Sequence, residues 1–328
     1  MPNAVHTSPD QKASTQAAKS EPGAPPPSPK GKMGVAVSYL PPPPEEERAA
    51  EVPASYTRSR SILEQGEALL SPFEKANIRW IRKSFESEAA DRAIQRLQKT
   101  VGASWLNAVT SNVRKIHGRD RLPDFDPQKS YVVVANHRSF FDMYVITAYL
   151  IRSLKHRIVF PVRSNFFYDH PLGPLVNGAM SFFAMYPPIF RDRKKAALNT
   201  ASLDELSELL NKPGMYAGIH PEGKRNLGDP YELLPAKPGM GRILHRTDAV
   251  VLPVFINGLS NDFVGQIKGN FAGGVPDVNV VFGAALDVSS FRARPESPEV
   301  HQEMSSFALA AVAKLAEEER QIRLASAK

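Results

Sequence analysis

A histidine and an aspartate five residues apart are the pair best suited to acid–base chemistry. His137 and Asp142 stand in the segment NHRSFFD (136–142), directly after YVVVA (131–135), a run typical of a short buried strand. In open α/β sheets, ligands bind beyond the carboxyl ends of the strands. A carboxylate on one ring nitrogen fixes the tautomer and leaves the other nitrogen free to take a proton. We therefore predict that His137 is a general base oriented by Asp142.

Two alternatives remain open for this segment. Taken alone, it also fits a surface turn whose aspartate caps the next helix. Ser139 as a nucleophile activated by His137 is disfavoured, because a separation of two residues on a turn rarely aligns such a pair.

Basic residues gather at 191–195, before a predicted helix over 194–210 whose acidic residues come later. This order opposes the helix dipole, which favours cations near the C-terminus. A bound phosphate at the helix start would offset the cost, because amides and cations both attract it. The alternative is an exposed basic turn.

A third segment, GIHPEGKRN (218–226), follows a predicted strand over 215–219. Glycine lets backbone amides approach a ligand closely. Lys224 and Arg225 supply positive charge suited to phosphate. Glu222 is expected to hold an arginine or to bind a substrate hydroxyl. Alone, the segment also fits a solvated turn.

The elements that must position these residues alternate between strand and helix. This order predicts an α/β fold with a mixed, mostly parallel sheet flanked by helices. Strands are predicted at 131–135, 157–162, 215–219, 250–255 and 278–282, and helices at 143–154, 194–210, 239–245 and 304–324. Pro253 lies inside a predicted strand, where proline usually marks an edge or a bulge.

The chain divides into three predicted parts. Residues 1–60 are rich in proline and charge, which predicts a disordered tail. Residues 61–120 form an N-terminal helical pair: Ser71, Pro72 and Glu74 predict a capped helix start, and a second helix is expected over about 90–115. Residues 121–328 form the α/β domain with its C-terminal helix. The first helix carries an aromatic residue among cations, which fits either an anionic membrane interface or a solvated face.

Composition narrows the function classes. The 328 residues are 42% hydrophobic and carry a formal charge of +7, which favours an anionic partner such as phosphorylated substrate, anionic lipid or nucleic acid. The chain has no cysteine, which excludes disulfides, thiolate catalysis and cysteine-bound zinc. It shows neither a signal-peptide pattern nor an apolar run of the roughly 18 residues that span a bilayer. We expect a cytoplasmic setting at a membrane surface.

Taken in order, the motifs resemble those of the glycerolipid acyltransferases, the 1-acylglycerol-3-phosphate and glycerol-3-phosphate acyltransferases. The resemblance covers about 71–282 and rests on NHRSFFD, IFRDR, PEGKR, KPG and VVLPVF. It implies catalysis by His137 and Asp142. The residues that it implies for phosphate or other substrate contacts are Asn136, Arg193, Glu222, Gly223, Lys224, Arg225, Lys237, Gly239 and Pro253. Two positions depart from the family pattern, His220 before the proline and Lys224 after the glycine.

The resemblance implies direct transfer of a fatty acyl group from acyl-CoA or acyl carrier protein to a lysophospholipid hydroxyl, most readily that of 1-acylglycerol-3-phosphate. No covalent acyl-enzyme, metal or cofactor is expected. The enzyme would act as a peripheral protein on the inner membrane surface, without nucleic acid. Alternatives are the same chemistry on glycerol-3-phosphate, another lysolipid, an amine or a sugar, or a non-catalytic module that binds anionic lipid or nucleic acid.

Overall fold

The computed structural model describes residues 61–326, so the predicted tail over 1–60 lies outside the described residues. Within this range seven strands form one sheet in the order β1-β7-β6-β2-β5-β3-β4. Neighbouring strands are parallel except β6 and β7, which are antiparallel. The strands are β1 (Arg114–His117), β2 (Tyr131–Ala135), β3 (Arg157–Arg163), β4 (Met185–Ile189), β5 (Met215–Ile219), β6 (Val250–Asn257) and β7 (Val278–Phe282). The predicted α/β class with a mixed, mostly parallel sheet is confirmed.

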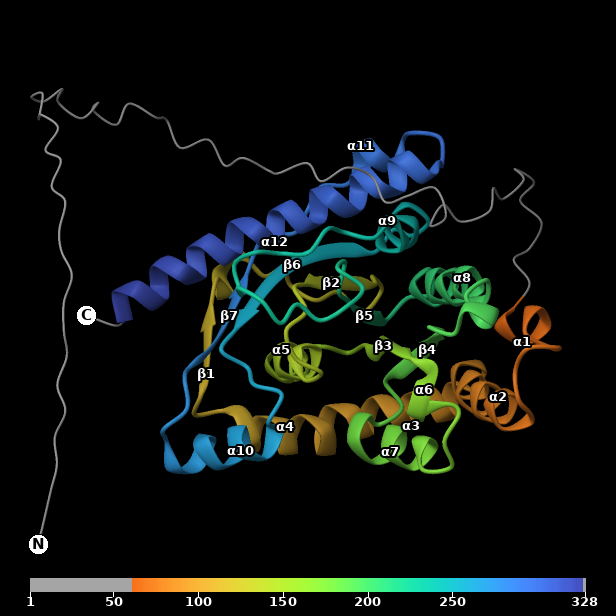
Figure 1. The fold of residues 1–328 in the computed structure, drawn as a ribbon, viewed down its shortest axis with the longest axis horizontal. Helices are drawn as coiled ribbons and strands as arrows, with labels where there is room; N and C mark the ends of the chain where they lie inside the picture. The colour runs from red at the N-terminus through yellow and green to blue at the C-terminus, as the bar shows by residue number, and fades with distance from the viewer. Residues whose placement is uncertain (1–60, 327–328) are drawn as a thin grey trace, which may run out of the picture. The chain divides into compact units, whose positions relative to one another are not determined.

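Helices cover both faces of this sheet (Figure 1). The N-terminal and sheet-flanking helices are α1 (Ile62–Gln65), α2 (Pro72–Glu86), α3 (Glu88–Leu97), η2 (Gln98–Gly102), α4 (Ala103–Thr110), α5 (Asp142–Leu150), α6 (Ser164–Phe167), α7 (Gly173–Ser181) and α8 (Leu198–Leu210). The others are α9 (Pro238–His245), α10 (Phe263–Ala272), α11 (Ser289–Arg292), α12 (Pro298–Ser326) and the short turns η3 (Arg119–Arg121) and η4 (Arg193–Lys195).

The central strand β2 shows how the core is divided. Successive strand residues point to opposite faces. Val132 and Val134 belong to the cluster formed with α8, α9 and α12, whereas Val133 packs with α5 residues such as Val145. All five β2 residues are buried. β2 is therefore packed between two core clusters, which fixes the position of the turn between β2 and α5.

Two strands escape prediction from the sequence. The expected helix over 90–115 is α3, η2 and α4, and it ends before β1, a half-exposed edge strand without apolar alternation. The helical segment predicted over 61–120 therefore includes β1, which belongs to the sheet. β4 contains Pro187 and Pro188 and lies at the opposite edge, where a missing N–H is tolerated.

Pro253 was expected to mark an edge or a bulge, and the structure excludes the edge. It lies in β6, an interior strand between β2 and β7, and not at an edge. The antiparallel pairing with β7 begins only at Val254, so no β7 residue needs an N–H from position 253. The carbonyl of Pro253 accepts a hydrogen bond from Gly283 N–H at 2.9 Å. Proline thus marks an irregularity in the ladder, because the next bridge, between Val251 and Leu286, is shifted in register by one residue.

The N-terminal helices are tied to the sheet by buried polar contacts. The predicted capping box of α2 is present: Ser71 Oγ accepts from Glu74 N, and Glu74 Oε2 accepts from Ser71 N. Arg157 of β3 is fully buried and pairs with Asp91 of α3 at 2.8 Å. Its guanidinium also lies 4.3 Å from the ring centroid of Phe85. No helix in residues 61–326 combines the length and hydropathy needed to cross a bilayer.

Candidate active site

The turn between β2 and α5 brings His137 and Asp142 together. His137 Nδ1 lies 3.1 Å from Asp142 Oδ2. The same oxygen accepts the backbone N–H groups of Arg138 at 2.7 Å and Ser139 at 2.8 Å. Asp142 is fully buried at the first position of α5, whereas the His137 side chain is 21% exposed. The contact predicted from the five-residue spacing is therefore present.

Burial and nearby cations set the charge of this pair. Burial, with smaller contributions from Arg225 and Arg191, lowers the pKa of His137 to about 4. Burial raises the pKa of the Asp142 carboxyl to about 6. Both shifts disfavour charge in a buried site, and the two groups titrate as one coupled pair. At neutral pH, the histidine is neutral and able to accept a proton, while the carboxylate is charged.

Two predicted substrate contacts instead hold this turn in place. Glu222 is 1% exposed, and its carboxylate accepts the N–H of His137 at 2.7 Å and that of Leu234 at 2.8 Å. Asn136 is fully buried and exchanges two hydrogen bonds with the backbone of Ile256. Both side chains bind protein backbone, and their expected contacts with substrate stay predictions. They position His137 from two neighbouring segments.

Ser139 is excluded as a nucleophile by its surroundings. It is fully buried, and its hydroxyl donates to the Ser260 carbonyl at 3.1 Å while accepting from Phe141 N–H. A nucleophilic hydroxyl must reach the substrate and its base. This hydroxyl stabilises the turn.

Three arginines, Arg163, Arg191 and Arg225, form a positive cluster, and two of them, Arg191 and Arg225, act on His137. Arg225 donates to Asn261 Oδ1 at 3.0 Å, and Arg191 donates weakly to the Gly223 carbonyl at 3.4 Å. Arg163 and Arg225 both lower the pKa of Arg191, in addition to its partial burial. Within residues 61–326, no carboxylate forms an ion pair with these three groups. Uncompensated guanidinium groups beside a base suit a phosphate.

The basic motif contains two arginines, Arg191 and Arg193, of which the sequence predicts only Arg193 as a phosphate contact. Arg193 begins η4 with an exposed side chain, and its expected phosphate contact stays a prediction. Arg191, two residues earlier, lowers the pKa of His137. Arg163, at the carboxyl end of β3, was also missed. The rule that ligands bind beyond the carboxyl ends of strands would have marked it.

The charge order along α8 has a structural explanation. Lys195 pairs with Glu74 of α2 at 2.7 Å. Asp204 is held by Arg242 and Arg246, and Glu205 accepts the N–H of Ile62 at 2.8 Å. Neighbouring elements thus compensate the unfavourable dipole interactions. No bound phosphate at the start of α8 is needed to explain the sequence.

The remaining predicted residues fall into two groups. Lys224 and Lys237 have exposed side chains next to the arginine cluster, and Gly223 adopts φ +66°, a left-handed conformation that favours glycine. A Cβ on Gly239 would lie 3.0 Å from Leu203 Cδ1, so this glycine permits close packing of α9 on α8. Gly239 and Pro253 therefore have structural surroundings that explain their presence without a substrate.

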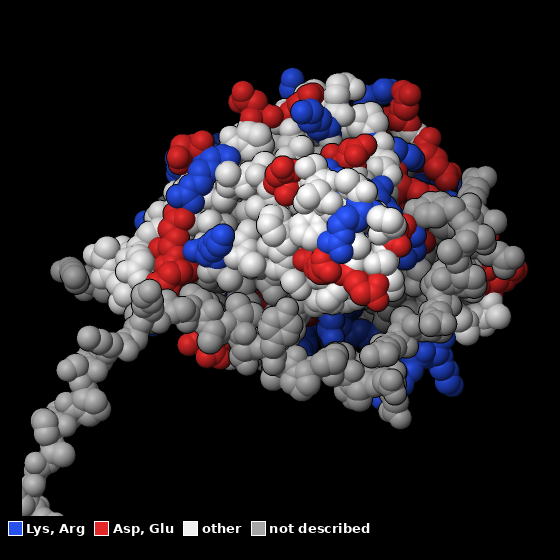
Figure 2. Space-filling model, turned by 90° about the horizontal axis from the view of Figure 1, so that it is seen from above, with Lys and Arg blue, Asp and Glu red and all other residues white. Residues whose placement is uncertain are grey.

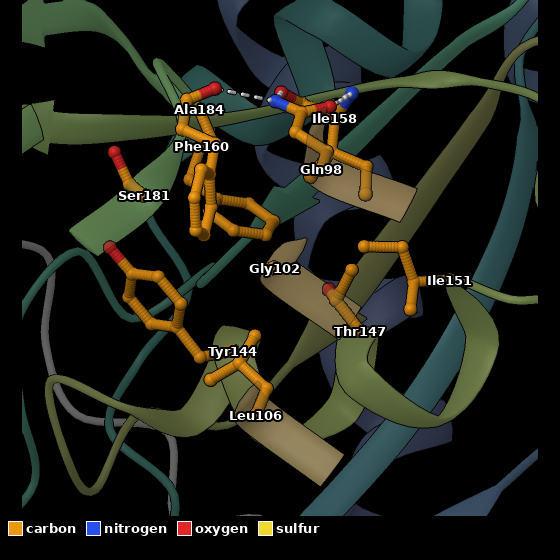
Figure 3. A pocket seen from close by; sticks show the side chains of 11 residues that line it. Gln98, Gly102, Leu106, Tyr144, Thr147, Ile151, Ile158, Phe160, Ser181 and Ala184 are labelled. Atoms are coloured by element: carbon orange, nitrogen blue, oxygen red, sulfur yellow. Dashed lines mark hydrogen bonds between the residues drawn. The ribbon is translucent and has the colours of Figure 1, made fainter. Parts of the chain in front are cut away.

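Aromatic side chains border the turn on its apolar side. Phe140 stacks on Phe167 with centroids 6.0 Å apart, and both Phe140 and Phe141 contact Tyr144. Tyr144 also lines a small, partly open cavity between α4, α5, η2 and β3 (Figure 3). The cavity holds about 20 Å³, room for roughly one water molecule. In this conformation it is too small for an acyl chain, whereas the half-buried phenylalanines offer an apolar surface beside His137.

The chain was compared with solved structures, curated sequences and protein families. A solved structure similar to this chain is the 1-acyl-sn-glycerophosphate (LPA) acyltransferase PlsC from Thermotoga maritima, with 20% identity, 79% of this chain and 87% of that chain covered, and a TM-score of 0.44. No curated protein sequence matches the chain. Residues 113–257, from β1 to the end of β6, match the family model described as Acyltransferase. This range contains the His137 turn and all three arginines, so the match to the family model covers the candidate site.

Proposed function

We propose that the protein transfers a fatty acyl group from a thioester to the hydroxyl of a lysophospholipid, most readily 1-acylglycerol-3-phosphate. The observation that carries this proposal is the combination of the His137–Asp142 pair with an uncompensated arginine cluster. The pair supplies a base for a hydroxyl group, and the cluster supplies a site for an anionic headgroup. The neighbouring phenylalanines supply apolar surface for acyl chains.

The proposed reaction is a direct transfer. His137 Nδ1–H donates to Asp142, so Nε2 is free to take the proton of the acceptor hydroxyl. The hydroxyl oxygen forms a bond to the acyl carbon as the carbon–sulfur bond breaks. The proton then passes from His137 to the leaving thiolate. Asp142 stabilises the transient imidazolium, and the donor is acyl-CoA or acyl carrier protein. The step needs neither a metal ion nor an organic cofactor.

Phosphate recognition favours lysophosphatidate over acceptors without a phosphomonoester. A cluster of three arginines, two of which act on His137, gives a dianionic headgroup more stabilisation than a zwitterionic one. The exposed lysine at position 224, unusual for the motif, adds to this charge. Glycerol-3-phosphate carries the same headgroup and remains the principal alternative acceptor.

A transfer assay tests this proposal. We would supply radiolabelled oleoyl-CoA or oleoyl acyl carrier protein with lysophosphatidate, glycerol-3-phosphate, lysophosphatidylcholine or monoacylglycerol. We expect lysophosphatidate to react fastest. Arg225→Gln should raise its KM by about tenfold, the effect of losing one charge-assisted contact of about 1.5 kcal/mol. Arg152→Gln, at an exposed site beyond the C-terminus of α5, is the matched control. Faster transfer to monoacylglycerol would refute the phosphate assignment.

Membrane docking through α2 is the second part of the proposal. Phe73, Arg79, Trp80 and Lys83 have exposed side chains on one side of this helix. Arg82, grouped with them in the sequence, instead pairs with Glu205 and Glu86. Exposed aromatic and basic residues on one helix face suit an anionic bilayer surface, here the cytoplasmic face of the inner membrane.

A vesicle sedimentation test separates docking from general charge attraction. Trp80→Ala combined with Arg79→Glu should abolish most binding to phosphatidylglycerol vesicles, whereas Arg92→Glu on α3 should retain it. Undiminished binding by the double variant would contradict docking through α2.

The face over α12 offers little support for a nucleic-acid partner. Acidic and basic side chains are interspersed there (Figure 2). Several are paired with each other, as in Arg294–Glu303 and Arg320–Glu317. Nucleic-acid sites instead gather basic residues along one stripe or patch.

A further inference from the structure

A second histidine lies against the proposed base. His220 follows β5 directly, and β5 pairs with β2, the strand that leads into His137. The two imidazole rings are stacked, with centroids 4.0 Å apart and planes inclined by 10°. The strand pairing therefore places a flat ring face to face with His137. The same position is one of the two departures from the family motifs in the sequence.

The tautomer of His220 is fixed by the strand beneath it. His220 Nδ1 lies 3.0 Å from the carbonyl oxygen of Ala135. A carbonyl can only accept, so Nδ1 carries the hydrogen and Nε2 is the unprotonated nitrogen of a neutral ring. Ala135 is the last residue of β2, so the ring is anchored to the strand that presents His137.

The two histidines share one carboxylate. One ring nitrogen of each histidine and one carboxylate oxygen of Asp142 all lie within 4.8 Å of one another. The other charged groups around the pair are Glu222, which is bound to two backbone amides, and the arginines at 138, 191 and 225. With one carboxylate and several cations nearby, a second proton on the stacked rings would be strongly disfavoured. Burial also lowers the pKa of His220 to about 3, which keeps its ring neutral.

We infer that His220 is a positioning residue for the acyl transfer: its neutral ring is a flat support that holds the His137 imidazole on Asp142 with Nε2 directed at the acceptor hydroxyl. A single hydrogen bond at Nδ1 leaves the His137 ring free to tilt about that contact. The stacked ring restricts this tilt. A flat neutral face also remains favourable when His137 becomes an imidazolium, because a cation is attracted to an aromatic face. This inference rests on the proposed function for its kinetic readout alone.

The test compares ring shape with volume. His220→Phe keeps a flat ring, His220→Leu keeps bulk without a flat face, and His117→Phe on edge strand β1 is the matched control. With oleoyl-CoA and lysophosphatidate, we expect His220→Leu to lower kcat by about tenfold or more, because small misplacements of reacting groups are costly. KM should change by less than about threefold, since the variant leaves the arginine cluster intact. His220→Phe should recover most of the lost kcat.

A substrate-free measurement separates this inference from the proposed function. The proton NMR signal of His137 Nδ1–H, assigned by its loss in His137→Gln, should be sharp in the wild type and in His220→Phe. It should broaden or vanish in His220→Leu, while circular dichroism shows that all variants are folded. An unchanged signal and kcat in His220→Leu would overturn the inference. Equal losses in the leucine and phenylalanine variants would overturn it as well, because a flat ring would then give no support. If the leucine variant fails to fold, a sharp signal in His220→Phe supports the inference, and its loss there refutes it.

Discussion

Replacing Asp142 with asparagine isolates the charge of the proposed catalytic pair from its geometry. Asp142 Oδ2 accepts from His137 and from two backbone amides, so an asparagine Oδ1 in the same place can keep all three contacts. The other carboxylate oxygen is buried without a hydrogen-bond partner within the described residues. The new NH₂ group would occupy that place. The turn should therefore persist while the negative charge is lost.

The expected loss follows from the distance between the charges. An imidazolium about 4 Å from a carboxylate gains about 4 kcal/mol at an effective dielectric constant of about 20. Each 1.4 kcal/mol changes the rate about tenfold, so removing the charge should lower kcat by about 10²–10³-fold. The buried, unsatisfied NH₂ group should also lower the unfolding free energy by about 1–3 kcal/mol.

The assay is thiol release from oleoyl-CoA in the presence of lysophosphatidate, read together with urea unfolding. Asp287→Asn is the control, because that carboxylate also accepts a backbone amide, Ser289 N–H, but lies outside the site. It should leave kcat unchanged. If Asp142→Asn is folded and its kcat falls by less than about threefold, the carboxylate does not stabilise an imidazolium, and the proposed role of the pair is wrong.

Three further predictions concern pH, anion binding and stability. Inorganic phosphate should raise the pKa of His137, because it offsets the charges of Arg225 and Arg191; an NMR titration with and without phosphate measures the shift, and an unchanged value would place the anion site elsewhere. His137 has its pKa lowered from 6.5 to about 4 in the folded state, so the unfolded chain binds more protons below about pH 6.5. Its contribution to the unfolding free energy should therefore be lost as the pH falls from about 6.5 to 4. The raised pKa of Asp142 acts in the opposite direction, but the wild type and His137→Gln both keep this carboxylate. The unfolding free energy of the wild type should therefore fall more steeply with falling pH than that of His137→Gln in urea unfolding, and parallel curves would contradict this. Arg157→Ala should lower the unfolding free energy by about 3 kcal/mol, because it leaves Asp91 without its buried partner; a loss below about 0.5 kcal/mol would show that this pair does not anchor α3.

The sequence predicts best where the contact is local. The five-residue spacing of His137 and Asp142 is enough to bring them together, because the turn after β2 is short and both ends are fixed. The strands that alternate with helices are found for the same reason, since their buried apolar runs are continuous in sequence. β1 and β4 are missed, because one is polar and half exposed and the other contains two prolines.

Side-chain roles that depend on distant segments are not predicted from the sequence. The sequence predicts Glu222 as a substrate contact, whereas its hydrogen bonds to the backbone of His137 and Leu234 are visible only in the structure. Arg191 and Arg193 are indistinguishable by composition, and only their placement relative to the turn separates them. The stacking of His220 on His137 requires the pairing of β2 with β5. These two strands are separated in the sequence by β3, β4 and the helices between them.

The most direct test of the central claim is acceptor-dependent thiol release by the wild type and His137→Ala. We expect release from a long-chain acyl-CoA, or from acyl carrier protein, to require lysophosphatidate and to fall by about 10²-fold or more in the variant. His117→Ala should retain wild-type activity. Equal activity of wild type and His137→Ala would show that His137 is not the base, and it would contradict the mechanism proposed for this site.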